Sequence, residues 1–200
     1  MLGGAVIVAL ALLTVALVAL VMNREDVQPE NAAGLDGVTV LNPPRELTDF
    51  TLTSDSGEPL SLSDLEGQYV LTYFGYTRCP DACPMTLLDF KRVKSALGAE
   101  AEGVTFLFVS VDGERDTPEL IDRYLERYDP AFIGMSGTDD VLLGIRDEYG
   151  LFYERRETEN GYLVDHTASS FLIDPQGRLV RVYSFTADPA VIAQDLAEQL

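Results

Sequence analysis

Side chains that can bind soft metals or carry thiol chemistry are scarce in this sequence of 200 residues. It contains two cysteines, Cys79 and Cys83, and one histidine, His166. So few cysteines exclude a miniprotein stapled by several disulfides. Any thiol or soft-metal chemistry must therefore use these three side chains.

Basic residues are also scarce: 33 acidic side chains stand against 14 basic ones, and the net charge is −19. A chain this acidic repels a phosphate backbone, so we expect no nucleic-acid partner. Hydrophobic residues make up 46% of the chain and charged ones 24%, which excludes a disordered or collagen-like protein. The length predicts one domain, at most with an appendage.

Residues 2–22 contain no charged side chain. As a helix they would span roughly 31 Å at about 1.5 Å per residue, which matches the hydrocarbon thickness of a bilayer. A cleaved signal peptide is the alternative, but its apolar stretch is usually about 7–15 residues long and ends at small residues. This stretch is longer and ends in Leu20-Val21-Met22-Asn23. We therefore expect residues 1–23 to be an uncleaved transmembrane anchor.

Residues 24–45 are rich in glycine, proline and polar side chains, which is typical of a linker. Within them, only residues 38–41 (Val-Thr-Val-Leu) suggest a short extended piece. We expect the folded domain to occupy residues 46–200.

The remaining sequence alternates between strand and helix patterns. Continuous apolar runs predict two buried strands, at 69–76 and 104–111. Turn signals predict three hairpins, with strands at 50–53 and 60–62, at 152–157 and 162–165, and at 171–173 and 179–183. Helical spacing and capping residues predict helices at 85–97, 117–128, 139–149 and 189–200. This order indicates an α/β domain with a mixed sheet, in which parallel strands come first and antiparallel hairpins last.

Both cysteines lie where the first buried strand leads into a helix, in the segment Cys79-Pro80-Asp81-Ala82-Cys83-Pro84. The residue before a proline is biased away from the helical region, and proline is favoured as the first helical residue. We therefore expect the helix to begin at Pro84, with both sulfurs at its N-terminal edge. Unpaired N–H groups and the helix dipole there favour thiolate over thiol.

Three residues separate the two cysteines, one more than in the Cys-x-x-Cys motif of redox proteins. The wider loop can place two thiolates on one metal ion, and it can still close a disulfide. His166 follows the predicted strand at 162–165, just before another strand of the same sheet, and strand ends converge near the loops that carry ligands. Two thiolates and one imidazole suit Cu(I), or zinc if a fourth ligand is present.

Simpler interpretations exist for each of these residues. Cys79 and Cys83 could form an inert disulfide outside the cytosol, and a lone histidine is often a surface or capped residue. Asp81 fits a turn or cap and Asp165 a solvated position, although either could orient a ligand. The methionines Met85 and Met135 fit core positions better than copper ligands.

Three segments closely resemble motifs of one family. Residues 74–84 (Phe-Gly-Tyr-Thr-Arg-Cys-Pro-Asp-Ala-Cys-Pro) resemble the copper-binding motif of the Sco/SenC proteins, which are copper chaperones of cytochrome c oxidase assembly. Residues 109–118 are similar to the second block of that family. Residues 164–167 with 171–175 are similar to its third block, which holds the metal-binding histidine. The resemblance runs roughly from Leu47 to the C-terminus.

The resemblance implies a thioredoxin-like fold, with Cys79, Cys83 and His166 as ligands of Cu(I) or Cu(II). It implies a membrane-anchored protein whose domain lies on the extracytoplasmic side. There the protein would deliver copper to the dinuclear copper site of an oxidase subunit, or reduce the cysteines of that site. Its further partners would be other copper carriers or thiol reductants. Arg78 departs from the family motif, since many relatives carry histidine or another residue there, but the three ligands are intact.

The alternative function is that of a membrane-anchored thiol–disulfide oxidoreductase or thiol peroxidase on the same fold, with Cys79 and Cys83 as the redox pair. Thioredoxin-like oxidoreductases are similar in having a proline three residues before the position of Phe171, where this chain has Ala168. The missing proline and the wider cysteine spacing count against general reductase activity. They leave room for reduction of one specific partner. A purely structural or redox-sensing domain would leave the placement of His166 unexplained.

Overall fold

The computed structural model describes residues 36–200. The expected anchor and most of the expected linker lie outside this part of the chain. Within it, no helix is both long and apolar enough to span a bilayer.

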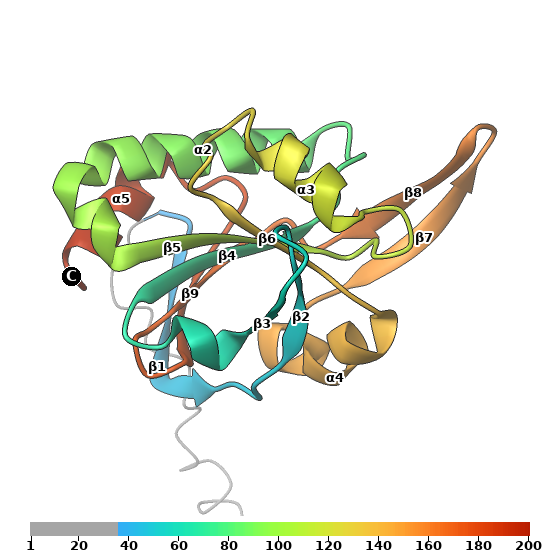
Figure 1. Ribbon diagram of the computed structural model, residues 1–200. Coiled ribbons are helices and arrows are strands. Elements are labelled where there is room, and N and C mark those ends of the chain that lie inside the picture. The colour runs from blue at the N-terminus through green and yellow to red at the C-terminus, as the bar shows by residue number, and fades with distance from the viewer. Residues whose placement is uncertain (1–35) are drawn as a thin grey trace, which may run out of the picture. The chain divides into compact units, whose positions relative to one another are not determined.

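An eight-stranded mixed sheet forms the centre of the domain (Figure 1), with the strand order β1-β10-β9-β4-β5-β6-β2-β3. Its strands are β1 (Val38–Glu46), β2 (Thr51–Ser54), β3 (Pro59–Ser61), β4 (Tyr69–Gly75), β5 (Val104–Ser110), β6 (Ile133–Ser136), β9 (Ser170–Ile173) and β10 (Arg178–Tyr183). The strands β4, β5 and β6 are parallel, β9 pairs antiparallel with β4, and β10 pairs antiparallel with β9. The predicted mixed sheet is therefore confirmed.

The helices are α2 (Ala82–Leu97), α3 (Pro118–Leu125), α4 (Asp139–Tyr149) and α5 (Pro189–Ala197), with short 3-10 helices η1 (Leu62–Leu65) and η2 (Gly98–Gly103). Local signals locate several of their ends. Thr117 caps α3 by accepting a hydrogen bond from the Leu120 N–H, and Gly150 ends α4 in the left-handed conformation. The predicted start of α2 is wrong, because the helix begins at Ala82 and takes in Cys83.

Strand β6 was not predicted, and β1 was predicted only as a short extended piece at residues 38–41. β1 covers the end of the expected linker, where it pairs antiparallel with β10 along Val38–Val40 and again at Arg45 and Glu46. Folded structure therefore begins before residue 46, because backbone pairing with a distant strand orders a segment whose composition resembles a linker. β6 is only four residues long and contains Gly134, so its pattern is weak. It carries the β2–β3 hairpin on the sheet by pairing with β2.

The two faces of β4 point into different layers of the domain. Helices α2 and α5 pack against one another on one side of the sheet, while α4 lies on the other (Figure 1). Tyr73 is directed toward α2 and its hydroxyl reaches Cys83, whereas the neighbouring Phe74 packs its ring against Tyr149 of α4. This alternation follows from the two-residue period of a strand. It brings the end of β4 against the first turn of α2.

The hairpin of β7 (Tyr153–Thr158) and β8 (Gly161–His166) projects from the body of the domain (Figure 1). It forms a separate two-stranded sheet, with Tyr153 opposite His166. The expectation that His166 shares a sheet with the next strand is therefore wrong.

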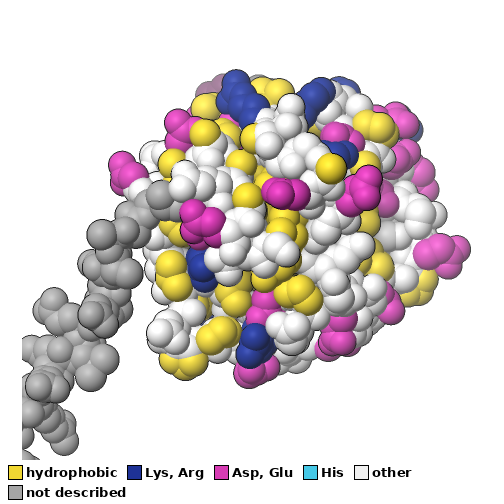
Figure 2. Space-filling model, turned by 90° about the vertical axis from the view of Figure 1, so that its left-hand side faces the viewer, with side chains coloured by type: hydrophobic (Ala, Val, Ile, Leu, Met, Phe, Trp, Pro, Cys, Tyr) yellow, Lys and Arg dark blue, Asp and Glu magenta, His cyan; other side chains and the backbone are white. Residues whose placement is uncertain are grey.

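Acidic side chains lie scattered over the face of the domain that Figure 2 shows, among neutral and apolar ones.

Candidate metal centre

Cys83 is a core residue in the first turn of α2. Its side chain is 0% exposed, and its sulfur accepts hydrogen bonds from the Tyr76 N–H at 3.5 Å and the Tyr73 hydroxyl at 3.7 Å. Gly75 makes room for this sulfur, because a Cβ at that position would lie 2.7 Å from Cys83 Sγ. This steric constraint explains why a glycine stands between Phe74 and Tyr76.

Cys79 lies in the loop between β4 and α2 and is partly exposed. Its own N–H donates to the Tyr76 carbonyl at 3.2 Å, which closes a turn, and its sulfur accepts the Cys83 N–H at 3.4 Å. The second bond uses one of the free N–H groups at the start of α2. Both sulfurs therefore lie at the N-terminal end of the helix, as predicted.

His166 reaches the two cysteines from the last position of β8. Its Nδ1 lies 3.0 Å from the Thr167 carbonyl oxygen, which orients the ring and leaves Nε2 on the side of the sulfurs. The ring is held edge-on between Tyr73 and Tyr76, with centroid distances of 5.9 and 5.6 Å. Its Nε2 points at the sulfurs.

The structure brings the three predicted residues into one cluster. His166 Nε2 lies 3.5 Å from Cys83 Sγ and 3.8 Å from Cys79 Sγ, and the three donor atoms are all within 4.8 Å of one another. Two soft sulfurs and one imidazole nitrogen match the ligands that select copper over harder ions. The residues present therefore fit a copper ion.

The two thiols differ in how easily they lose a proton. Hydrogen bonds from the Cys83 thiol, from His166 and from the backbone N–H groups of Cys83 and Asp81 lower the pKa of Cys79 from the ordinary 9.0 to about 4. Burial raises the pKa of Cys83, and the neighbouring Cys79 sulfur raises it further. Cys79 is therefore a thiolate at neutral pH, while Cys83 keeps its proton until a metal ion or a reaction displaces it.

Other residues considered from the sequence lie outside the cluster. Asp81 is the N-cap residue of α2, and Asp165 forms a surface ion pair with Arg156 at 2.9 Å. Met135 is buried as predicted, but the prediction for Met85 is wrong, because 49% of it is exposed. Sequence reasoning missed Tyr73, which looks like any other apolar residue of a buried strand.

Comparison with known proteins completes the description. The SCO1/SenC family model matches residues 39–200. The chain belongs to the SCO1/SenC family. The Sco-family chain is 31% identical to the SCO2-like protein of Rickettsia felis, over 74% of this chain and 74% of that protein.

Two solved Sco structures are similar to it. ScoI of Bradyrhizobium japonicum, whose structure has copper bound, has a TM-score of 0.71 and 35% identity, over 78% of this chain and 99% of that one. Apo Sco1 of Thermus thermophilus has a TM-score of 0.71 and 41% identity, over 81% and 95% of the two chains. These likenesses confirm the thioredoxin-like fold that the motif resemblance implies.

Proposed function

We propose that this protein is a copper chaperone that holds a copper ion between Cys79, Cys83 and His166 and passes it to the dinuclear copper site of a cytochrome c oxidase subunit. The observation that carries the proposal is the convergence of two thiol sulfurs and one imidazole nitrogen within 4.8 Å. The copper in the structure of the relative from Bradyrhizobium japonicum supports the choice of metal.

The cluster has the properties that a carrier needs. Cys79 and His166 are half-buried, so an acceptor's sulfur and imidazole ligands can reach the ion from the open side. Cys83 is enclosed by Tyr73 and Gly75, so one ligand stays fixed while the other two exchange. Copper binds only the dithiol form, and oxidation of the pair therefore stops loading. Protons compete for the sulfurs, so affinity falls as the pH drops.

The proposal also includes the location of the protein in the cell. Residues 1–23 would anchor the chain in a membrane, with the copper site on the extracytoplasmic side, where the oxidase subunit exposes its own copper ligands. Alkaline extraction of membranes tests the anchor. A chain that appears in the soluble fraction would exclude it.

Anaerobic titration of the full-length chain in detergent with Cu(I), in competition with a chelator, tests the carrier function. We expect one ion per chain, and transfer to a purified oxidase copper domain. Failure to bind copper stoichiometrically, together with fast reduction of generic disulfides, would exclude the chaperone function.

A thiol–disulfide oxidoreductase is the second candidate, favoured by the pairing of a thiolate at Cys79 with a protonated, buried Cys83. The Cys79 thiolate would attack a partner's disulfide and release one partner thiolate. Cys83 would then lose its proton and displace the second thiolate, which leaves a Cys79–Cys83 disulfide and a partner reduced by two electrons. A His166→Ala variant separates the two functions, because it removes a proposed copper ligand and leaves both thiols of the redox pair in place.

A further inference from the structure

The two halves of the metal centre come from separate parts of the fold. Both cysteines lie in the turn that joins β4 to α2, whereas His166 lies at the end of a hairpin that pairs with no strand of the eight-stranded sheet. The segment of residues 112–116, between β5 and α3, touches both parts. We call this segment the bridge loop; none of its residues is among the three proposed copper ligands.

Asp116 connects the bridge loop to the cysteine turn. Its carboxylate is 1% exposed and accepts hydrogen bonds from the Thr77 N–H at 2.8 Å and the Thr77 hydroxyl at 2.6 Å. A third bond, from the Ser110 hydroxyl at 2.7 Å, fixes the carboxylate to the end of β5. Thr77 stands two residues before Cys79, so a buried charge holds the turn that carries this sulfur.

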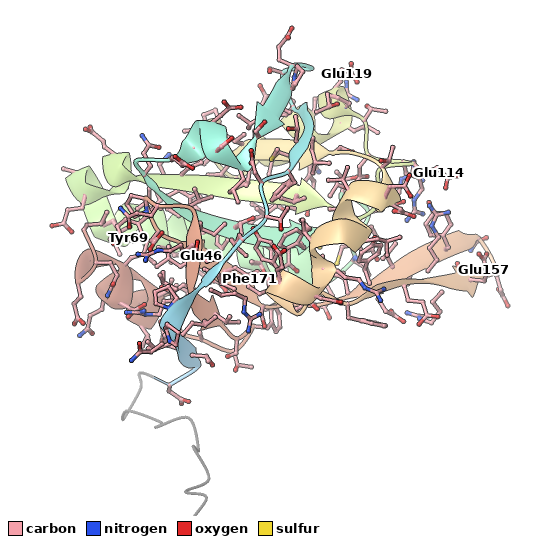
Figure 3. The ribbon with its side chains drawn as sticks, turned by 90° about the horizontal axis from the view of Figure 1, so that it is seen from below. Glu46, Tyr69, Glu114, Glu119, Glu157 and Phe171 are labelled. Atoms are coloured by element: carbon pink, nitrogen blue, oxygen red, sulfur yellow. The ribbon has the colours of Figure 1, made fainter. Side chains whose placement is uncertain are left out.

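Asp112 and Arg115 connect the same loop to the histidine hairpin. Asp112, also 1% exposed, accepts the Tyr162 hydroxyl at 2.8 Å and forms an ion pair with Arg115. The Arg115 guanidinium donates to the Tyr162 carbonyl at 2.9 Å and lies 3.5 Å from the centroid of its ring. Tyr162 belongs to β8, four residues before His166. On β7, Arg155 pairs with Glu114 at 2.6 Å, and Figure 3 shows Glu114 beside the hairpin whose outer end carries Glu157.

The bridge loop therefore contacts both the cysteine turn and the hairpin that carries His166. A projecting hairpin has little core of its own, so side-chain contacts must set its distance from the cysteines. Hydrogen bonds to buried carboxylates are strong and directional, because a buried carboxylate oxygen that lacks a donor is costly. From these contacts we propose that the bridge loop positions the metal centre, with Asp116 holding Cys79 and Asp112 holding His166 at the separation that copper binding needs. This inference rests on the proposed copper site.

A double-mutant cycle tests the proposal. Thr77→Val removes one hydrogen bond to Asp116 at nearly constant shape, and Asp116→Ala removes all of them. We expect Cu(I) affinity to fall about fivefold and about fiftyfold, respectively, in chelator competition on the full-length chain. In a His166→Ala background only the cysteine turn is left to bind copper, so the same changes should cost less than about twofold. Equal costs in both backgrounds would overturn the proposal.

A matched control separates positioning from general stability. The Ser136 hydroxyl donates to the backbone carbonyl of Asp116 at 2.8 Å, without touching the carboxylate. Ser136→Ala should therefore lower the free energy of unfolding and leave copper affinity within about twofold of wild type. A loss of affinity equal to that of Thr77→Val would show that the effect is one of stability alone.

A metal-free measurement keeps the proposal separate from the proposed function. In the apo protein, NMR contacts between the rings of His166 and Tyr76 report the approach of the hairpin to the cysteine turn. We expect Thr77→Val to weaken them and Asp116→Ala to abolish them, if the latter variant folds. Unchanged contacts in Thr77→Val would overturn the bridge-loop proposal. If the wild-type chain binds no copper, the proposed function fails and the NMR result alone decides about the bridge loop.

Discussion

The cysteine side and the histidine side of the metal centre are built in different ways. Cys83 is 0% exposed, and its sulfur is packed against Tyr73 and the backbone of Gly75. His166 ends a projecting hairpin and is only half-buried, held by its Nδ1 bond to Thr167 and by two tyrosine rings. One proposed ligand is thus part of the hydrophobic core, while the other lies at its surface. Changes on the two sides should therefore divide differently between copper affinity and stability.

The largest effect is expected from Cys83→Ser. The loss of a ligand should cost more than about a thousandfold in Cu(I) affinity, since groups that only orient a ligand already cost roughly 10–100-fold. Replacing a buried sulfur by a hydroxyl should also lower the free energy of unfolding by about 1–3 kcal/mol. Chelator competition and denaturant unfolding of the metal-free chain measure the two quantities. Unchanged stability would break the assignment of Cys83 to the core.

His166→Ala should lower copper affinity with little loss of stability. We expect copper affinity to fall about a hundredfold, with less than about 1 kcal/mol lost from the free energy of unfolding, because the ring is half-exposed. The same two measurements apply. A loss of stability equal to that of Cys83→Ser would contradict the proposed difference between a core cysteine and a surface histidine.

Gly75→Ala tests the packing of the cysteine side without removing a ligand. The new Cβ would lie 2.7 Å from Cys83 Sγ and 2.8 Å from a ring carbon of Tyr73, so something must shift. We expect about 1–3 kcal/mol of destabilisation and a fall in copper affinity of about tenfold. Gly144→Ala is the control, because a Cβ there meets no atom within 4 Å and should stabilise the exposed face of α4 by about 0.5–1 kcal/mol.

A further prediction concerns the pH dependence of stability that Cys79 causes in the metal-free chain. A pKa lowered from 9.0 to about 4 means that the folded chain holds the thiolate better than the unfolded chain does. Its contribution to stability is complete above pH 9 and is lost as the pH falls toward about 4. The difference in the free energy of unfolding between wild type and Cys79→Ala should therefore become smaller as the pH is lowered from 9 toward about 4.

Alkylation of the metal-free protein is an independent measurement of the pKa of Cys79. Iodoacetamide should modify Cys79 with a rate that is half-maximal near pH 4 and should spare the buried Cys83. His166→Ala removes one hydrogen bond to the sulfur and should move this midpoint upward. A midpoint near 9 in wild type would contradict the proposed thiolate.

Local chemistry explains what could be read from residues alone. The buried runs at β4 and β5, the cap at Thr117 and the turn at Gly150 were predictable, because each depends on neighbours in the sequence. Strand β6 and the full length of β1 were not predictable, since they are ordered by pairing with distant strands. Asp116 stood inside a segment similar to the second block of the family, yet nothing local assigned it to Thr77, which lies 39 residues earlier.

The sequence by itself determined which atoms were available: two sulfurs and one imidazole nitrogen, with both sulfurs confined to one turn by their spacing. Only the tertiary structure decided that the imidazole reaches them, because His166 is 83 residues from Cys83 and arrives on a separate hairpin. It also decided that the sulfurs differ. Burial and hydrogen bonding depend on what surrounds each atom in space, so the same residue type became a thiolate at Cys79 and a protonated core residue at Cys83.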